Sequence, residues 1–165
     1  MGVNQRSQIE MTADEIEDYV ARSRNATLAT IGKDGQPHLV AMWYAYFDGA
    51  FWFETKGRAQ KAVNVGRDPR ATILIEDGQT YDVLRGVSID GTAEIVDDPE
   101  ALWKVGVAVW ERYNGPYSDE VKPLVEFMLN KRVAIKVTPT RWRSWDHRKL
   151  GMAPIELGGS TANAL

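Results

Sequence analysis

Cysteine is absent from this chain of 165 residues, and histidine occurs only twice. Without cysteine the chain can form no disulfide, no thiolate nucleophile and no cysteine-ligated metal site. The two histidines, His38 and His147, have no carboxylates at metal-ligand spacing, so no metal site is expected. A G-x-S-x-G elbow is also missing. Covalent and metal catalysis therefore lose their usual residues, and an enzyme with this sequence would depend on a cofactor for its reactivity.

Long apolar runs and a strong charge imbalance are missing as well. No apolar run approaches the roughly 18 residues that a membrane span needs, and the first residues lack the apolar core of a signal peptide. A formal net charge of −3 gives no general attraction to nucleic acid or to an anionic membrane. With 44% hydrophobic and 26% charged residues, we expect one soluble, cytoplasmic domain over residues 1–165. Its core covers about 12–150, and residues 151–165 form an irregular tail.

Most of the predicted secondary-structure elements are β-strands. Runs rich in β-branched and aromatic residues lie at 26–32, 37–47, 50–55, 71–76, 81–96, 132–139 and 140–145. Asp-Gly pairs at 34–35, 48–49 and 77–78 predict turns between neighbouring strands, and the pair at 90–91 predicts either a hairpin or a bulge. Both alternating faces of residues 39–47 are apolar, which predicts that neither face meets water.

Helices are predicted at three places outside these runs. Thr12 and Glu15 have the spacing of a capping box at the start of residues 12–23. Residues 97–113 and 118–131 have helical periodicity, the first with an aspartate cap and Pro99 in its first turn. Six or seven strands with few helices predict a mainly β fold, a small antiparallel barrel.

The connection at residues 55–64, TKGRAQKAVN, gathers positive charge between two apolar strands. A short helix is predicted to begin near Gly57, with Ala59, Ala62, Val63 and Gly66 as its apolar face. A helix start offers free N–H groups and a positive dipole end, to which Thr55, Lys56 and Lys61 add a hydroxyl and charge. The pattern favours an anion pocket, and a solvated basic helix face is the alternative.

These segments, in this order, carry a family resemblance. GQPHLVAMWYAYFDG, FWFETKGRAQKAVNVGRDPRATILIED and YDVLRGVSIDGTAEI together resemble the flavin-binding split barrels of the pyridoxamine-phosphate-oxidase-like superfamily. They are most similar to the branch that uses a deazaflavin, coenzyme F420, in place of FMN. The resemblance covers roughly residues 12–150. It implies a six-stranded antiparallel split β-barrel with a few peripheral helices, which acts as a homodimer with two cofactor sites between the subunits.

The resemblance also implies which residues hold the cofactor. The strand that lies along the flavin ring contains Val40, Ala41, Met42, Trp43 and Tyr44. Glu54 and Thr55 end the next strand, and Lys61 matches the lysine that holds the phosphate. The same pocket contains Lys56, Arg58 and Asn64. Arg85 and Gly86 match positions that approach the cofactor, in part from the partner subunit, and Trp145 matches a tryptophan that lines the site.

The chain departs from pyridoxamine phosphate oxidases in two places. It ends in WDHRKLGMAPIELGG instead of their substrate-gripping Arg-Leu-His-Asp-Arg segment, so oxidation of vitamin B6 is not expected. It has Ala59-Gln60-Lys61 where they have Ser-Arg-Lys, and Lys56 and Arg58 compensate for the missing cation. The further basic residues suit the longer anionic tail of F420. Arg67 and Arg70 serve either that tail or the ordinary surface.

The implied activity is hydride transfer from reduced F420 to an activated double bond of a small organic substrate. Tyr44, Tyr46 and His147 are candidate proton donors, with packing or hydrogen bonding as the alternative role for each. Two other functions stay open. One is an FMN-dependent oxidase or reductase on the same fold, and the other is a non-catalytic protein that binds flavin, F420 or haem.

Overall fold

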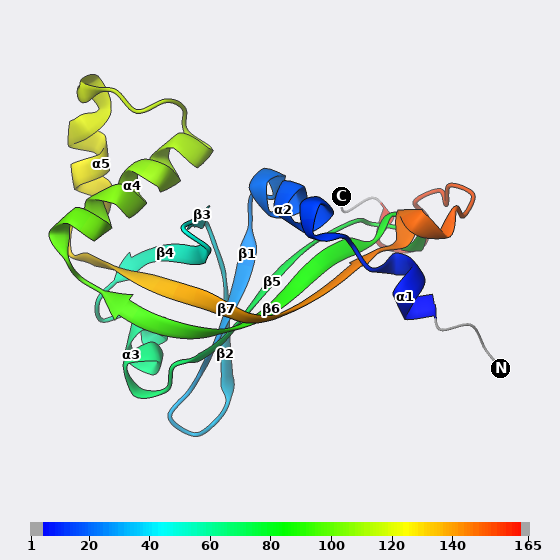
Figure 1. Cartoon of the computed structure of the whole chain (residues 1–165), viewed down its shortest axis with the longest axis horizontal. Helices are drawn as coiled ribbons and strands as arrows, with labels where there is room; N and C mark the ends of the chain where they lie inside the picture. The colour runs from blue at the N-terminus through cyan, green and yellow to red at the C-terminus, as the bar shows by residue number, and fades with distance from the viewer. Residues whose placement is uncertain (1–4, 163–165) are drawn as a thin grey trace.

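The structure is a computed structural model that describes residues 5–162, and its centre is one antiparallel sheet that curls into a half-barrel (Figure 1). Its strands are β1 (Ala26–Ile31), β2 (Pro37–Met42), β3 (Ala45–Phe47), β4 (Ala50–Lys56), β5 (Arg70–Asp77), β6 (Arg85–Val96) and β7 (Arg132–Asp146). They lie in the order β2-β1-β5-β6-β7-β4-β3. The predicted mainly β, antiparallel architecture is confirmed. The strand number implied by the resemblance is wrong, because this sheet has seven strands and not six.

Trp43 and Tyr44 interrupt the strand that was predicted at 37–47. Before them β2 pairs with β1, and after them β3 pairs with β4, so the two halves lie at opposite edges of the sheet. At this break the backbone N–H of Tyr44 donates to the hydroxyl of Tyr113 at 3.0 Å. The runs predicted at 132–139 and 140–145 instead join into the single strand β7, which pairs with β6 from Ala134 to Asp146.

The Asp-Gly pairs have three different geometries. Asp48 and Gly49 both have positive φ, 52° and 70°, as a type I′ turn requires, and they join β3 to β4. The pairs at 34–35 and 77–78 also join neighbouring strands, but there only the glycine has positive φ. The pair at 90–91 lies inside β6 at a shift in its register with β7. Of the two predicted alternatives for this last pair, the bulge is therefore confirmed.

Four of the helices confirm predicted ones, with shifted starts, and α1 was not predicted. They are α1 (Gln5–Ile9), α2 (Ala13–Arg22), α3 (Gln60–Arg67), α4 (Pro99–Tyr113) and α5 (Lys122–Leu129), with 3-10 turns η1 (Tyr81–Val83), η2 (Asp119–Val121) and η3 (His147–Leu150). Thr12 and Glu15 form both bonds of the capping box on α2. The helix predicted near Gly57 begins at Gln60. Residues 151–162 contain no regular helix or strand, as predicted for the tail, and residues 163–165 lie outside the described part.

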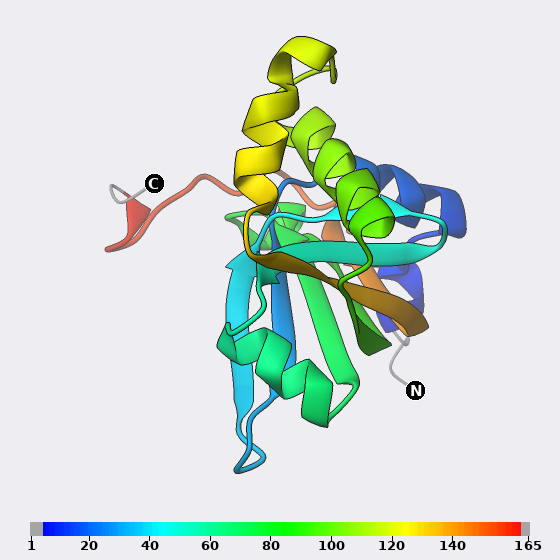
Figure 2. The same ribbon diagram turned by 90° about the vertical axis from the view of Figure 1, so that its left-hand side faces the viewer.

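Burial differs sharply between β4 and β2. Every residue of β4 before Lys56 is buried, because the larger core packs on one face and α4 packs on the other (Figure 2). By contrast β2 alternates between exposed and half-buried residues, and Leu39 is 61% exposed. The expectation that neither face of 39–47 meets water is therefore wrong for the single chain.

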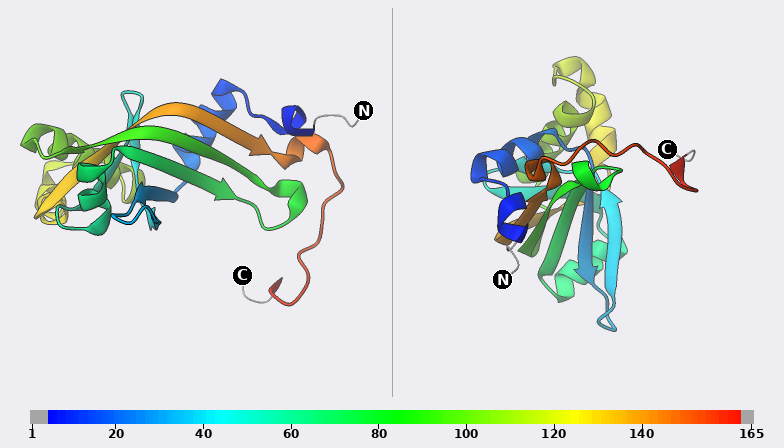
Figure 3. Two further views of the ribbon diagram at one scale, coloured as in Figure 1. Left: turned by 90° about the horizontal axis from the view of Figure 1, so that it is seen from below. Right: turned by 90° about the vertical axis from the view of Figure 1, so that its right-hand side faces the viewer.

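The two ends of the long β6–β7 pair carry different elements (Figures 1 and 3). At one end lie α3, α4 and α5, and at the other lie α1, η1 and η3. From η3 the tail runs away from the sheet (Figure 3). At about 3.3 Å per residue, the ends of β7 are on the order of 40 Å apart. Side chains at the two ends therefore cannot reach the same small molecule.

Gly86 gives a stability test of the β6–β7 pairing. It lies opposite Trp145, and a Cβ at this position would overlap the indole and approach the carbonyl oxygen of Ile75 to 2.8 Å. We expect Gly86→Ala to lower the free energy of unfolding by about 1–3 kcal/mol, measured by urea denaturation. Gly66→Ala in α3 is the control, because nothing lies within 4 Å of its Cβ position. That change should stabilise by about 0.5–1 kcal/mol through helix propensity. Equal effects of the two changes would contradict the close packing.

Candidate functional site

A basic pocket forms where β4 ends and β7 begins. Lys56 lies opposite Arg132 in the register of these strands, and Gly57 and Arg58 follow it toward α3. A hollow of about 510 Å³ is lined by Lys56, Gly57, Arg58 and Lys131. The register thus brings two basic segments, 56–58 and 131–132, to one place although they are distant in sequence.

Lys61 stands at the start of α3, close enough to Arg132 for their charges to interact. Burial lowers the pKa of its ammonium, and the nearby charge of Arg132 lowers it further. We call Lys56, Arg58, Lys61, Lys131 and Arg132 the basic cluster. The helix above it begins after Ala59, whose side chain cannot cap the first N–H groups. Uncapped N–H groups and crowded cations are the features that favour an anion, phosphate above all.

Asn64 positions α3 on the sheet. Its side chain is fully buried, and its amide nitrogen donates to the hydroxyl of Thr30 in β1 at 3.0 Å. Its amide oxygen accepts from Gln60 at 2.8 Å and from Arg67 at 3.2 Å. The predicted apolar face of this helix is wrong at Val63, which is 50% exposed, and at Gly66, which is also exposed. Compared with the prediction, α3 turns a different face toward the sheet, because the buried side chain of Asn64 needs a polar partner on β1.

The remaining cations of this stretch are engaged within the chain. Arg67 donates to the carbonyl oxygen of Ile31 as well as to Asn64. Arg70 forms a two-bond ion pair with Asp68, at 3.0 and 2.7 Å. Of the two roles left open for Arg67 and Arg70, these contacts favour the structural one.

Glu54 places a buried carboxylate beside the basic cluster. It is 9% exposed, its Oε1 lies 4.0 Å from Nη1 of Arg132, and its Oε2 has no hydrogen-bond partner in the part of the chain that the structure describes. Burial raises the pKa of this carboxyl, while the charges of Arg132 and Lys56 act against that rise. Thr55, the next residue, is 4% exposed.

The predicted ring-binding strand divides into an exposed and a buried part. Val40, Ala41 and Met42 lie on β2, whose outer edge pairs with no other strand among residues 5–162. Trp43 is 49% exposed and stacks on Tyr113, with ring centroids 4.3 Å apart. Tyr44 is fully buried and donates its hydroxyl proton to the carbonyl oxygen of Val20, and burial raises its pKa. Tyr44 is therefore a packing residue in this structure and not an accessible proton donor.

Arg85, Gly86 and Trp145 form a separate distal group at the far end of β6 and β7. Arg85 forms an ion pair with Asp77 at 2.7 Å and lies over the ring of Tyr19. Gly86 and Trp145 are cross-strand partners. His147 follows and its Nδ1 is 2.9 Å from the carbonyl oxygen of Tyr81. The structure therefore brings Glu54 through Asn64 together, but it does not bring the distal group to them within one chain.

Within residues 5–162 no group of three or more His, Asp or Glu side chains is placed to hold a metal ion. In the same range no helix is long and apolar enough to cross a bilayer.

Comparison with known proteins identifies the family. The profile of the family described as pyridoxamine 5'-phosphate oxidase matches residues 12–146. The chain belongs to this family. A solved member, a conserved hypothetical protein from Mycobacterium tuberculosis, is 62% identical to it with a TM-score of 0.92. That match covers 96% of this chain and 99% of the other.

Two further relatives in the pyridoxamine 5'-phosphate oxidase family carry functional names. An F420H(2)-dependent biliverdin reductase from Mycobacterium tuberculosis (strain CDC 1551 / Oshkosh) is 25% identical over 121 residues, which are 72% of this chain and 85% of that protein. The solved structure of an F420 reductase is 28% identical with a TM-score of 0.57, over 76% of this chain and 94% of the other. These matches confirm the resemblance recognised in the sequence, including its F420-using branch.

Lys131 and Arg132 are the site residues that sequence reasoning missed. They stand at the start of a strand in the segment NKRVAIKV, where basic residues look like an ordinary strand flank. Only the pairing of β4 with β7 places them beside Lys56. The residue pattern of one segment alone cannot show which residues of the two strands lie opposite each other.

Glu54 gives a pH-dependent test of the buried site. Because burial raises its pKa above the ordinary 4.5, the folded chain holds this proton more tightly than the unfolded chain. The stability contributed by the protonated form is complete below pH 4.5 and is lost as pH rises through the raised pKa. Chemical denaturation of Glu54→Gln across pH 4–8 should therefore show a gain over the wild type that grows with pH. Glu94→Gln, which removes an exposed carboxylate from the same sheet, controls for the lost charge. A gain from Glu54→Gln that is constant with pH would contradict the assignment.

Proposed function

We propose that this protein is an oxidoreductase that uses reduced coenzyme F420 to reduce an activated double bond of a small organic substrate. The observation that carries the proposal is the basic cluster at the uncapped start of α3. The named relatives that use F420 support the choice of cofactor. Reduced F420 supplies a hydride when it is bound, which the side chains of this protein cannot supply themselves.

The residues of the basic cluster fit a cofactor with several negative charges. Lys61 and the N–H groups at the start of α3 would hold the phosphate. Lys56, Arg58 and Lys131 line the adjoining hollow. Lys56 already donates to the carbonyl oxygen of Asn130 at 2.8 Å, whereas no ion pair within residues 5–162 involves Arg58 or Lys131, so these two can meet further carboxylates. FMN carries one phosphate, whereas F420 carries a phosphate and a glutamate tail. The extra cations therefore favour F420, and FMN in the same pocket is the alternative.

The edge strand β2 would orient the ring. Its outer edge offers backbone N–H and C=O groups that no strand satisfies within the described residues. Trp43, held flat on Tyr113, adds an exposed aromatic face next to this edge. A planar ring placed here finds hydrogen-bond partners and apolar contact together, and ordering of ring and substrate is how such a site accelerates hydride transfer.

A homodimer would complete the site. The distal group is on the order of 40 Å from the basic cluster along β7, so one chain cannot bring both to one cofactor. A second copy can place its Arg85, Gly86 and Trp145 beside the basic cluster of the first. Leu39 and the other exposed residues of β2 supply an apolar surface for that contact.

Titration with the two cofactors tests the proposal directly. We expect the purified protein to bind F420 more tightly than FMN, as measured by fluorescence titration. We also expect it to oxidise reduced F420 in the presence of quinones, enones or tetrapyrroles. Lys61→Glu should weaken F420 binding about a hundredfold, because a charge-assisted hydrogen bond is replaced by repulsion. Lys122→Glu on the exposed face of α5 is the matched control and should leave the affinity unchanged. Tighter binding of FMN would overturn the assignment of F420 as the cofactor. Tight binding of F420 without turnover of any acceptor would favour a non-catalytic binding protein.

Mixed dimers test the shared site. We expect Lys61→Glu and Trp145→Ala proteins each to be inactive, with folded structure confirmed by circular dichroism. After unfolding and refolding of the two together, half of the dimers are mixed, and each mixed dimer holds one site with neither change. About one quarter of the wild-type activity should return. No recovery, with mixed dimers demonstrated by mass spectrometry, would contradict a site shared between two chains.

A further inference from the structure

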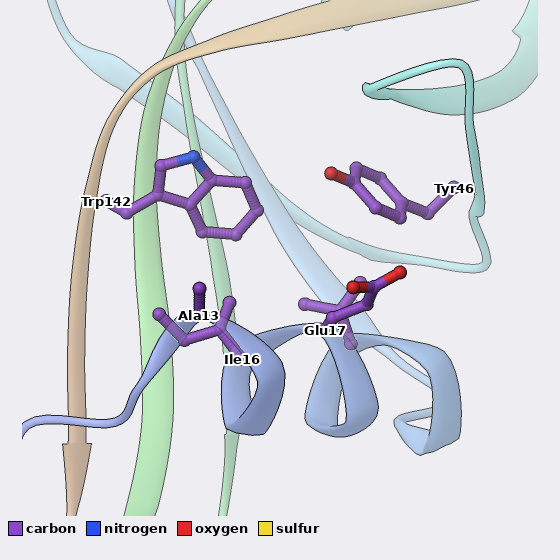
Figure 4. Close-up of a pocket in the computed structure, with 6 residues that line it drawn as sticks. Ala13, Ile16, Glu17, Tyr46 and Trp142 are labelled. Atoms are coloured by element: carbon purple, nitrogen blue, oxygen red, sulfur yellow. The ribbon is translucent and has the colours of Figure 1, made fainter.

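A second pocket opens at the mouth of the half-barrel, between α2 and the sheet. Its volume is about 500 Å³, and it is lined by Ala13, Ile16, Glu17, Val20, Tyr46 and Trp142 (Figure 4). We call it the mouth pocket. None of these residues belongs to the basic cluster, to the edge strand β2 or to the distal group. Barrel mouths are frequent ligand sites, and this volume lies in the usual range for one small organic molecule.

The walls of the mouth pocket are apolar and aromatic. The rings of Tyr46 and Trp142 meet edge to face with centroids 6.5 Å apart, and Tyr46 also packs on Phe51 at 4.6 Å. Figure 4 shows these two rings on the side facing α2, with Ala13 and Ile16 opposite them. Both rings are half-buried, so each keeps some surface open to the pocket. Such π faces attract cations as well as apolar groups.

The helix on the other side is fixed, so the pocket is preformed. The capping box holds the start of α2, and just before it the backbone N–H of Met11 donates to the hydroxyl of Ser144 at 3.0 Å. Near the other end Tyr19 and Val20 are buried in the core. A preformed pocket costs little ordering on binding.

The lining of this pocket carries a negative charge, and the nearby Arg112 donates to the backbone carbonyl oxygen of Val20. Glu17 is its one charged lining residue, and Figure 4 shows the Glu17 side chain directed toward the space under Tyr46. On the same helix Glu15 pairs with Lys149 and Asp18 pairs with Arg22. The ion pairs found within residues 5–162 leave Asp14 and Glu17 without a cation. An apolar cavity with aromatic walls and one unpaired carboxylate at its rim matches the chemistry of an organic ammonium ion.

We propose that the mouth pocket binds a small organic cation, an amine with an apolar body, at a site separate from the cofactor site. The apolar body would lie between Ile16, Val20 and the two aromatic rings. The ammonium group would lie between the ring faces and the carboxylate of Glu17. This inference does not depend on which cofactor the protein uses.

A series of three probes with the same apolar body tests the charge preference. Binding of 3-phenylpropylammonium, 3-phenylpropanol and 3-phenylpropionate is measured by calorimetry and by the indole N–H signal of Trp142, assigned with Trp142→Phe. We expect the cation to bind about fivefold more tightly than the alcohol, and the carboxylate to bind most weakly. Glu17→Gln should remove the advantage of the cation over the alcohol. Asp14→Asn, on the same helix but outside the pocket, should keep it.

A second variant tests the location. Ala13 is exposed in the first turn of α2 and lines the pocket, so Ala13→Phe should fill the space and abolish binding with an unchanged unfolding midpoint. Equal affinity for all three probes, or no saturable binding up to about 10 mM, would overturn the proposal. Retained binding in Ala13→Phe would overturn the location. A change of oligomeric state in Ala13→Phe, seen by light scattering, would show that a second copy covers the pocket and would also overturn it.

Discussion

Repulsion between like charges at one end of the sheet is the constraint around which this site is built. Lys56 and Arg132 occupy opposed positions on β4 and β7, where like charges destabilise a strand pair. The fold offsets part of this with internal acceptors: Lys56 donates to the carbonyl oxygen of Asn130, and Arg132 lies beside Glu54. Within residues 5–162 no ion pair offsets Arg58, Lys61 or Lys131. A bound anion would relieve this repulsion, and binding at the pocket would then stabilise the fold.

The cations stay in place because the elements beneath them are rigid. β4 is buried on both faces before Lys56, between the barrel core and α4, so its end cannot swing away from β7. The hydrogen bond from Asn64 to Thr30 fixes α3 on β1 in the same way. The repulsion between the gathered cations is thus offset by packing and hydrogen bonding in the elements beneath them. Such support from surrounding residues keeps a binding site preorganised.

Local patterns in the sequence were sufficient to predict the features that depend only on neighbouring residues. The capping box at Thr12, the type I′ turn at Asp48 and the helix after Pro99 depend on residues within a few positions, and all three are present as predicted. The predictions failed where distant residues decide. Tyr113, on a helix far along the chain, helps to break the strand at Tyr44, and Thr30 decides which face of α3 is buried. Lys131 and Arg132 were missed for the same reason, since strand register is a property of two segments and not of one.

The length and continuity of β6 and β7 constrain how a complete site can arise. Paired with each other from Ala134 to Asp146 and flanked by β5 and β4, the two strands have no hinge that would fold one end onto the other. The bulge at 90–91 curves the pair without interrupting it. Trp145 and Arg85 therefore stay remote from the basic cluster of their own chain in any conformation that keeps the sheet. If both groups serve one cofactor, the second group must come from another copy, and the exposed residues of β2, Leu39 among them, are available for that contact.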